Sequence, residues 1–254
     1  MALFNDGPAS SIEDLHGHDT QLLDVASVEG IDVTRKLALA QDQMATELAT
    51  LLARLSMAGE IGTLATTPGI EQVVVTPPLK LWHTFLTLEL VYRDAYNSQL
   101  NDRYAGKRDE FHGLAKWAYD KLIQSGIGIA RDPIPQAAQP TVSVVAGALA
   151  DGTYYVAASW TNRSGEEGAI STATAITTSG STFLVQPAQA PANATGWNIY
   201  AGTSPGALVL QNASPLQVNQ AWTQPSRLAD TGGPASTGQK PNYMRQAPRI
   251  LQRG

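Results

Sequence analysis

Two histidines separated by one glycine, His16 and His18, are the residues whose spacing comes nearest to that of a metal site. Imidazole is a common zinc ligand, but zinc centres in proteins take at least three protein ligands. No third ligand is marked by spacing near this pair, and the chain contains no cysteine that would supply a thiolate. We therefore interpret both histidines as structural or solvent-exposed residues, and we expect no metal site and no cofactor.

Adjacent carboxylates at Glu166 and Glu167 are the candidates for general acid and base work, the chemistry of a cell-wall hydrolase. They lie in a glycine-rich stretch that is typical of a hairpin rather than a cleft. Phosphate-binding loops, His-Glu-x-x-His zinc motifs and Gly-x-Ser-x-Gly nucleophile turns do not occur in the sequence. We predict that the chain has no catalytic residues and is not an enzyme, and we keep a cell-wall hydrolase as the second alternative.

The C-terminus carries a local positive charge that the rest of the chain does not share. The formal net charge of the protein is -5 at pH 7, yet residues 240–254 contain one lysine and three arginines and no acidic residue. Glycine and proline are frequent there, so residues 236–254 are predicted to form a basic, extended arm that orders on a partner. The residues predicted to bind that partner are Tyr243, Arg245, Arg249, Ile250 and Arg253. A frayed terminus and contact with DNA phosphates are the alternatives for this arm.

The composition indicates which classes of protein are compatible with this sequence. The chain has 254 residues, of which 43% are hydrophobic and only 15% are charged, and a low charge suggests surfaces that become covered. The sequence begins without a basic and apolar signal segment, and no run of eighteen apolar residues occurs. We expect neither an export signal nor a membrane span.

The first half of the chain has the periodicity of amphipathic helices. Apolar residues recur every three or four positions over 32–57, 76–100 and 107–125, and a shorter helical segment is expected around Ile12 to Val25. Asp32 or Thr34 is a candidate cap of the first long helix, and Thr76 is a candidate cap of the second. Gly126 is expected to end the third. The segment 69–76 is predicted to be a loop with strand tendency. An antiparallel helical bundle is therefore predicted for residues 1–128.

The second half has the pattern of an all-β module. Three prolines within 133–140 predict a linker over 129–140, and alternating residues then predict about seven short strands over 141–235. The predicted class is α+β with two domains, the second a β-sandwich. We interpret most of its aromatic residues as part of the core, and glycan binding by them is the alternative. These residues are Trp160, Trp197, Tyr200 and Trp222.

Two stretches of the helical part and three of the β part resemble components of tailed bacteriophages. Residues 30–48 (GIDVTRKLALAQDQMATEL) and 81–97 (LWHTFLTLELVYRDAYN) resemble head-tail adaptor proteins, which are small helical bundles. Residues 152–160 (GTYYVAASW), 165–168 (GEEG) and 196–206 (GWNIYAGTSPG) look like the immunoglobulin- or fibronectin type III-like modules of phage virion proteins, which implies that fold for the β-sandwich. Together the two resemblances cover most of the chain.

The resemblance implies a structural role at the head-tail junction of the virion, assembled in the host cytoplasm. It implies a homo-oligomeric ring of about twelve copies that surrounds the DNA channel and joins the portal protein to tail or neck proteins. The C-terminal arm would reach the portal, and DNA would be near but bound without specificity. The β module would serve as decoration, as a fibre attachment or as a glycan-binding module, which is the first alternative function. This sequence departs from the simplest adaptors because its arm follows the β module and must return to the bundle.

Overall fold

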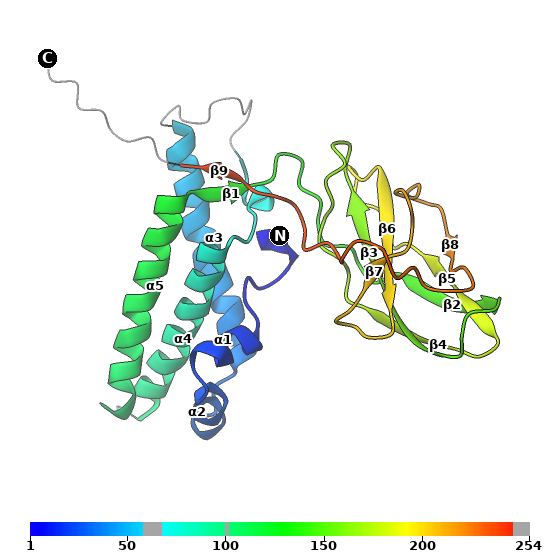
Figure 1. Cartoon of the computed structure of the whole chain (residues 1–254). Helices are drawn as coiled ribbons and strands as arrows, with labels where there is room; N and C mark the ends of the chain where they lie inside the picture. The colour runs from blue at the N-terminus through cyan, green and yellow to red at the C-terminus, as the bar shows by residue number, and fades with distance from the viewer. Residues whose placement is uncertain (58–67, 100–101, 246–254) are drawn as a thin grey trace, which may run out of the picture. The chain divides into compact units, whose positions relative to one another are not determined.

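The computed structural model describes residues 1–57, 68–99, 102–245 of the chain (Figure 1). They form two compact units. The helical unit contains Gly7–Ile129 and Pro241–Gly254, and the β unit contains Met1–Asp6 and Ala130–Lys240. Helices precede strands, and all strand pairs are antiparallel, so the predicted α+β class is confirmed.

Five α-helices form the described part of the helical unit. They are α1 (Ile12–His18), α2 (Leu22–Glu29), α3 (Val33–Met57), α4 (Pro77–Gln99) and α5 (Ala105–Ser125), with 3-10 turns at Ile70–Gln72 and Asp102–Tyr104. Helix α4 packs against the other four, and its Tyr92 ring stacks on Phe111 of α5 with centroids 5.6 Å apart. Met44 and Leu48 of α3 are fully buried in the same unit. No helix among the described residues is both long and apolar enough to cross a membrane.

The long helices begin and end close to the predicted residues, for the expected reasons. Asp32 precedes α3 and its Oδ1 accepts a hydrogen bond of 3.0 Å from the Arg35 amide, so Asp32 rather than Thr34 is the cap. Thr76 precedes α4, but its buried hydroxyl has no partner among the described residues. Pro78, the second helical residue, lacks one of the two amide hydrogens that such a cap can bind.

The first helical segment is two helices rather than the single one expected. The break between α1 and α2 falls at Asp19, which is only 6% exposed. Its carboxylate accepts hydrogen bonds from the Tyr92 hydroxyl of α4 and from the Gln21 amide. A buried carboxylate held by these two donors fixes the turn, and no apolar periodicity signals it.

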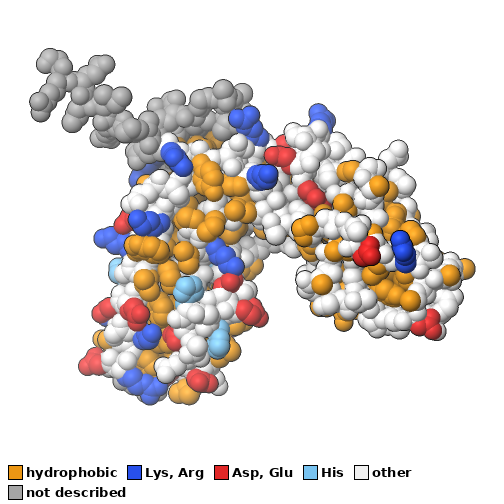
Figure 2. All heavy atoms as spheres, in the orientation of Figure 1, with side chains coloured by type: hydrophobic (Ala, Val, Ile, Leu, Met, Phe, Trp, Pro, Cys, Tyr) orange, Lys and Arg blue, Asp and Glu red, His pale blue; other side chains and the backbone are white. Residues whose placement is uncertain are grey.

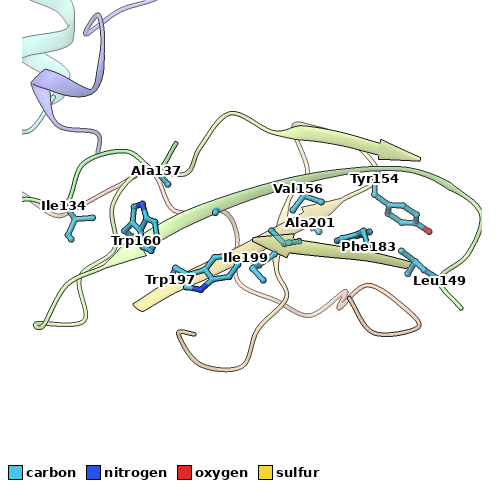
Figure 3. Packing of buried hydrophobic residues seen from close by; sticks show 12 residues of the cluster. Ile134, Ala137, Leu149, Tyr154, Val156, Trp160, Phe183, Trp197, Ile199 and Ala201 are labelled. Atoms are coloured by element: carbon cyan, nitrogen blue, oxygen red, sulfur yellow. The ribbon is translucent and has the colours of Figure 1, made fainter. Parts of the chain in front are cut away.

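The β unit contains two antiparallel sheets that share one core. One sheet has the order β2-β5-β8 and the other β4-β3-β6-β7. The strands are β2 (Thr141–Ala146), β3 (Gly152–Thr161), β4 (Thr174–Thr178), β5 (Ser181–Gln186), β6 (Gly196–Gly202), β7 (Val209–Leu210) and β8 (Trp222–Thr223). Figure 3 shows side chains of β3, β5 and β6, among them Val156, Phe183 and Ile199, gathered in this core.

Strand β3 is buried on both faces, which the alternation of its residues does not indicate. Tyr154, Val156, Ala158 and Trp160, which share one face of the strand, are all buried in the shared core. On the opposite face, Ala157 is also buried, against side chains from segments that include Leu208. Irregular segments therefore cover the outer face of this sheet.

The borders of the two units differ from the predicted ones at both ends of the β unit. The proline-rich segment 129–140 is no free linker, because Ile134 and Ala137 belong to the core of the β unit and are 1% and 6% exposed. Residues Met1–Asp6 also belong to this unit. Their Asp6 Oδ1 accepts a hydrogen bond of 2.8 Å from the Gln136 amide. Apolar anchors between the prolines account for the first difference.

Candidate functional site

The C-terminal segment returns to the helical unit and forms a strand there. Strand β9 (Asn242–Met244) pairs antiparallel with β1 (Ile127–Ile129), which directly follows α5 (Figure 1). The register places Gly128 opposite Tyr243. The β unit is therefore inserted between two segments of the helical unit. The arm predicted over 236–254 is corrected at its start, because residues up to Lys240 belong to the β unit and Asn242–Met244 form an ordered strand.

Strand β1 lies between β9 and the segment that precedes α4. On that side Val73 forms an antiparallel bridge with Ile129, and the Val74 amide donates a hydrogen bond of 2.9 Å to the Gly128 carbonyl. The predicted loop with strand tendency thus pairs within the helical unit. Among the described residues, β9 has no neighbour on its other side.

This arrangement leaves the backbone of Tyr243 directed away from the sheet. In an antiparallel strand the amide and carbonyl groups of one residue point to the same side, and those of the next residue point to the opposite side. Because Gly128 bonds to Val74, its neighbours Ile127 and Ile129 bond toward β9, and Tyr243 faces outward. The Tyr243 side chain is 47% exposed. We call this surface, made by the backbone and side chain of Tyr243, the β9 edge.

Two glycines allow β9 to lie against the end of α5. Gly126 caps α5 with φ of 96°, and a Cβ atom there would lie 2.6 Å from the Met244 carbonyl oxygen. At Gly128 a Cβ atom would lie 2.8 Å from the Pro241 side chain. Both positions require glycine, so the sequence of β1 is adapted to the presence of β9.

Arg245 fixes the end of β9 to α5. Its Nε atom donates a hydrogen bond of 2.9 Å to the carbonyl oxygen of Ser125, the last residue of α5. A cation at this place also interacts favourably with the partial negative charge of a helix C-terminus. Arg245, predicted to bind a partner, therefore has a bonded role within its own unit.

The remaining predicted partner-binding residues cannot be placed. Arg249, Ile250 and Arg253 lie outside the described residues. Tyr243 and Arg245 are brought together at one end of the helical unit, next to α5. Sequence reasoning missed β1 and β9, each of which has three residues. The signal that points to them is the pair of glycines at 126 and 128, directly after a helix.

The histidines considered for metal binding do not form such a site. His16 and His18 are exposed on α1, and the His18 ring packs edge-on against Phe85 with centroids 4.8 Å apart. Within the described ranges, no three histidine, aspartate or glutamate side chains gather in a way that would hold a metal ion. Packing rather than ligation explains the position of His18.

The carboxylates considered for acid and base work take part in hydrogen bonds of the β unit. Glu167 accepts from the hydroxyls of Ser159 and Tyr200, the latter at 2.6 Å. Glu166 accepts from the side-chain amides of Asn162 and Gln239, at 3.0 and 2.8 Å. Burial and the neighbouring Glu167 raise the pKa of the Tyr200 hydroxyl. Each carboxylate thus accepts hydrogen bonds from buried donors, which is a structural role.

The aromatic residues considered for glycan binding lie mostly in the core. Trp160, Trp197 and Tyr200 are 3%, 0% and 2% exposed, and Trp222 is half-buried against the same core. Trp197 donates its indole hydrogen to the Gln217 carbonyl at 3.0 Å. A sugar ring has no access to the first three, so packing accounts for them.

A polar depression of about 610 Å³ lies between α2, α3 and α4 in the helical unit. Its charged residues are engaged in contacts of the fold. Lys36 forms an ion pair with Asp94, and Glu29 accepts hydrogen bonds from Tyr104 and Ser98. The hydrogen bond from Tyr104 is the main cause that lowers the pKa of Glu29. The Lys36–Asp94 pair and the hydrogen-bonded Glu29 therefore have structural uses in the depression.

His83 is the most strongly shifted histidine of the described chain. It is fully buried on α4, and burial lowers its pKa from 6.5 to about 4. Its Nε2 atom lies 3.1 Å from the Leu37 carbonyl oxygen, to which it donates, so Nδ1 accepts from the Ser10 hydroxyl at 2.6 Å. A neutral histidine with both nitrogens bonded joins three segments of the bundle and has a structural role.

The chain was also compared with known proteins. No family of proteins matches it, and no curated protein matches it in sequence.

Proposed function

We propose that this chain is a structural virion protein, the adaptor subunit of a tailed-bacteriophage head-tail connector. Copies form a ring between the portal and the tail or neck, around the DNA channel, and the subunit is not an enzyme. The observation that carries the proposal is the return of the C-terminus to the helical unit as an edge strand. The arm follows the β unit in sequence, and this strand brings it back to the helical unit, as an adaptor arm requires.

The β9 edge is the proposed contact with the portal. The outward amide and carbonyl of Tyr243 can pair with an extended segment of another protein, which is the β-augmentation mode of recognition. The adjoining tyrosine side chain adds an exposed aromatic contact. Arg249, Ile250 and Arg253 follow in sequence and are proposed to extend the same contact.

The described charged groups support a geometric rather than a chemical role. Glu166 and Glu167 accept hydrogen bonds from buried donors, and Lys36 and Asp94 of the polar depression form an ion pair. The β unit, with sheets of three and four strands, fits the proposed immunoglobulin- or fibronectin type III-like module. In this proposal the module decorates the neck or contacts neighbouring virion proteins.

A variant that changes only the outward backbone of β9 tests the portal contact. Tyr243→Pro removes an amide hydrogen that faces away from β1, and an edge strand tolerates proline in that orientation. Tyr243→Ala is the matched control for loss of the side chain. The measurement is the mass of the full-length chain mixed with the portal protein of the same phage.

We expect Tyr243→Pro to abolish the complex and Tyr243→Ala to weaken it. Equal portal binding by the wild type and the proline variant would exclude the β9 edge as the contact. A reconstruction of the virion without this chain at the neck would refute the adaptor function itself.

A further inference from the structure

Trp117 is an exposed aromatic residue on a polar helix surface. It is 47% exposed, while the buried residues of α5, such as Phe111 and Leu122, lie on another side of the helix. The residues one turn before and after it, Gly113 and Lys121, are exposed as well. A tryptophan that projects from such a surface is typical of the energetic centre of a protein interface.

A groove of about 330 Å³ lies between α3, α4 and α5. Trp82 and Leu86 of α4 and Tyr119 of α5 give it an apolar lining. The rings of Trp82 and Tyr119 meet edge to face with centroids 5.0 Å apart. Figure 2 shows hydrophobic side chains gathered between charged ones on the helical unit. Such a lining suits a further aromatic side chain, because aromatic rings favour edge-to-face and offset contacts.

The border of the groove carries more negative than positive charge. Glu47 and Glu89 stand against the single lysine Lys116, which gives a net charge of -1 while His112 is neutral. Glu89 lies 3.2 Å from the His112 ring nitrogen, and Glu47 is exposed on α3. The border thus fits a partner whose aromatic residue is followed by a cation.

Trp117 and the groove lie on opposite sides of α5. Tyr119 follows Trp117 by two residues, which is a rotation of about 160° around a helix with 3.6 residues per turn. A surface feature and its complement on opposite sides of one subunit give a head-to-tail contact, which closes into a ring when the rotation between copies allows. A second copy of this chain therefore offers both the aromatic residue and, one turn later, Lys121.

We infer that Trp117 of one copy inserts into the groove of the next copy, with its Lys121 beside Glu47. This inference rests on the proposed function, because it specifies how the ring subunits join. The contact uses the apolar lining for affinity and the Lys121–Glu47 pair for orientation. Each copy keeps its β9 edge available for another protein.

The first test is the oligomeric mass of the full-length chain, measured by sedimentation over a range of concentrations. Trp117→Ala is expected to weaken self-association by about thirtyfold or more, the usual effect of losing an interface tryptophan. Its thermal unfolding should match the wild type, because the side chain is exposed. Leu39→Ser is the control: it removes an exposed apolar residue of α3 and should leave association unchanged.

A charge exchange tests the pairing of the two surfaces. Glu47→Lys and Lys121→Glu are each expected to weaken association, and the double variant is expected to restore it, because it re-forms the pair with reversed signs. Failure of the double variant to recover would overturn the proposed orientation.

Other outcomes would show that the groove is occupied by another segment or is not used in association. The inference would be overturned if Trp117→Ala associated like the wild type while deletion of residues 246–254 abolished association. That result would assign the groove to the C-terminal segment. A chain that stays monomeric at all concentrations would also overturn it. Portal binding by the wild-type chain and the position of this chain in a virion reconstruction, both measured separately, test the adaptor function independently of either result.

Discussion

Arg245 and Ser125 are joined by a hydrogen bond of 2.9 Å, from the guanidinium Nε atom to the carbonyl oxygen of the last residue of α5. The two residues are 120 positions apart in sequence, with the whole of β2 to β8 between them. The bond therefore ties the returning C-terminus to the helix from which the chain left. Any force on the arm is passed to α5 through this bond and the β1–β9 ladder.

Loss of this bond is expected to destabilise the helical unit modestly. Arg245→Ala removes a donor to the last carbonyl of α5 and a cation near the negative helix end, an effect of about 0.3–1 kcal/mol. The measurement is urea unfolding followed by circular dichroism at the helix band. Arg93→Ala, which removes an exposed arginine within α4, is the control and should change the midpoint little. Equal midpoints for the two variants would contradict the role of Arg245.

Gly113 inside α5 and Gly126 directly after it are expected to respond to alanine with opposite signs. Gly126 has φ of 96° and lies against Met244, so Gly126→Ala should destabilise the helical unit by about 1–2 kcal/mol and displace β9. Gly113 is inside the helix with open space around it, so Gly113→Ala should stabilise it by about 0.5–1 kcal/mol. Thermal unfolding of both variants gives the signs. A destabilised Gly113→Ala would show that this position is packed.

The helices could be predicted from sequence because their signals are local. In α3 the apolar residues recur every three or four positions over 25 residues. The cap at Asp32 and the stop at Gly126 each act within one helical turn. Among the strands predicted over 141–235, β3 (Gly152–Thr161) has the strongest signal, because its alternation extends over ten residues. Predictions held where the determinant lay within the element itself.

The parts of the site that escaped prediction depend on contacts between distant residues. Tyr243 becomes part of a strand only because β1, more than a hundred residues earlier, offers a ladder. Asp19 breaks the first helix because Tyr92 donates to it from α4. Ile134 anchors a proline-rich segment that composition alone predicts to be free. Such pairings of distant residues leave no periodic trace in a single sequence.

The Glu167 carboxylate is expected to stabilise the β unit. Glu167→Ala leaves the buried Tyr200 hydroxyl and the Ser159 hydroxyl without their acceptor, at a cost of about 1–3 kcal/mol. Adding Tyr200→Phe should recover part of this loss, because one unpaired donor is then removed. Unfolding followed by tryptophan fluorescence measures both variants, with the exposed Asp230→Ala as control. Additive losses in the double variant would mean that the two groups do not interact.

The buried His83 is expected to make the helical unit less stable in mild acid. Its pKa is about 4 in the folded chain and 6.5 without burial, so between these values the unfolded chain binds the extra proton. The stability that neutral His83 supports is complete above pH 6.5 and is lost as the pH falls toward 4. At pH 5 the loss relative to pH 7.5 is about 2 kcal/mol.

Urea unfolding at pH 7.5 and 5 measures this loss, and variants isolate the group responsible. His83→Gln lacks a titrating ring and should show a smaller difference between the two pH values than the wild type. His16→Gln changes an exposed histidine on α1 and should keep the wild-type difference. If His83→Gln retained the full pH dependence, the buried ring would not be its source. Protonation of Nδ1 removes the acceptor of the Ser10 hydroxyl, while Nε2 keeps its donation to Leu37, so acid should first weaken the contact of α4 with the segment of Ser10.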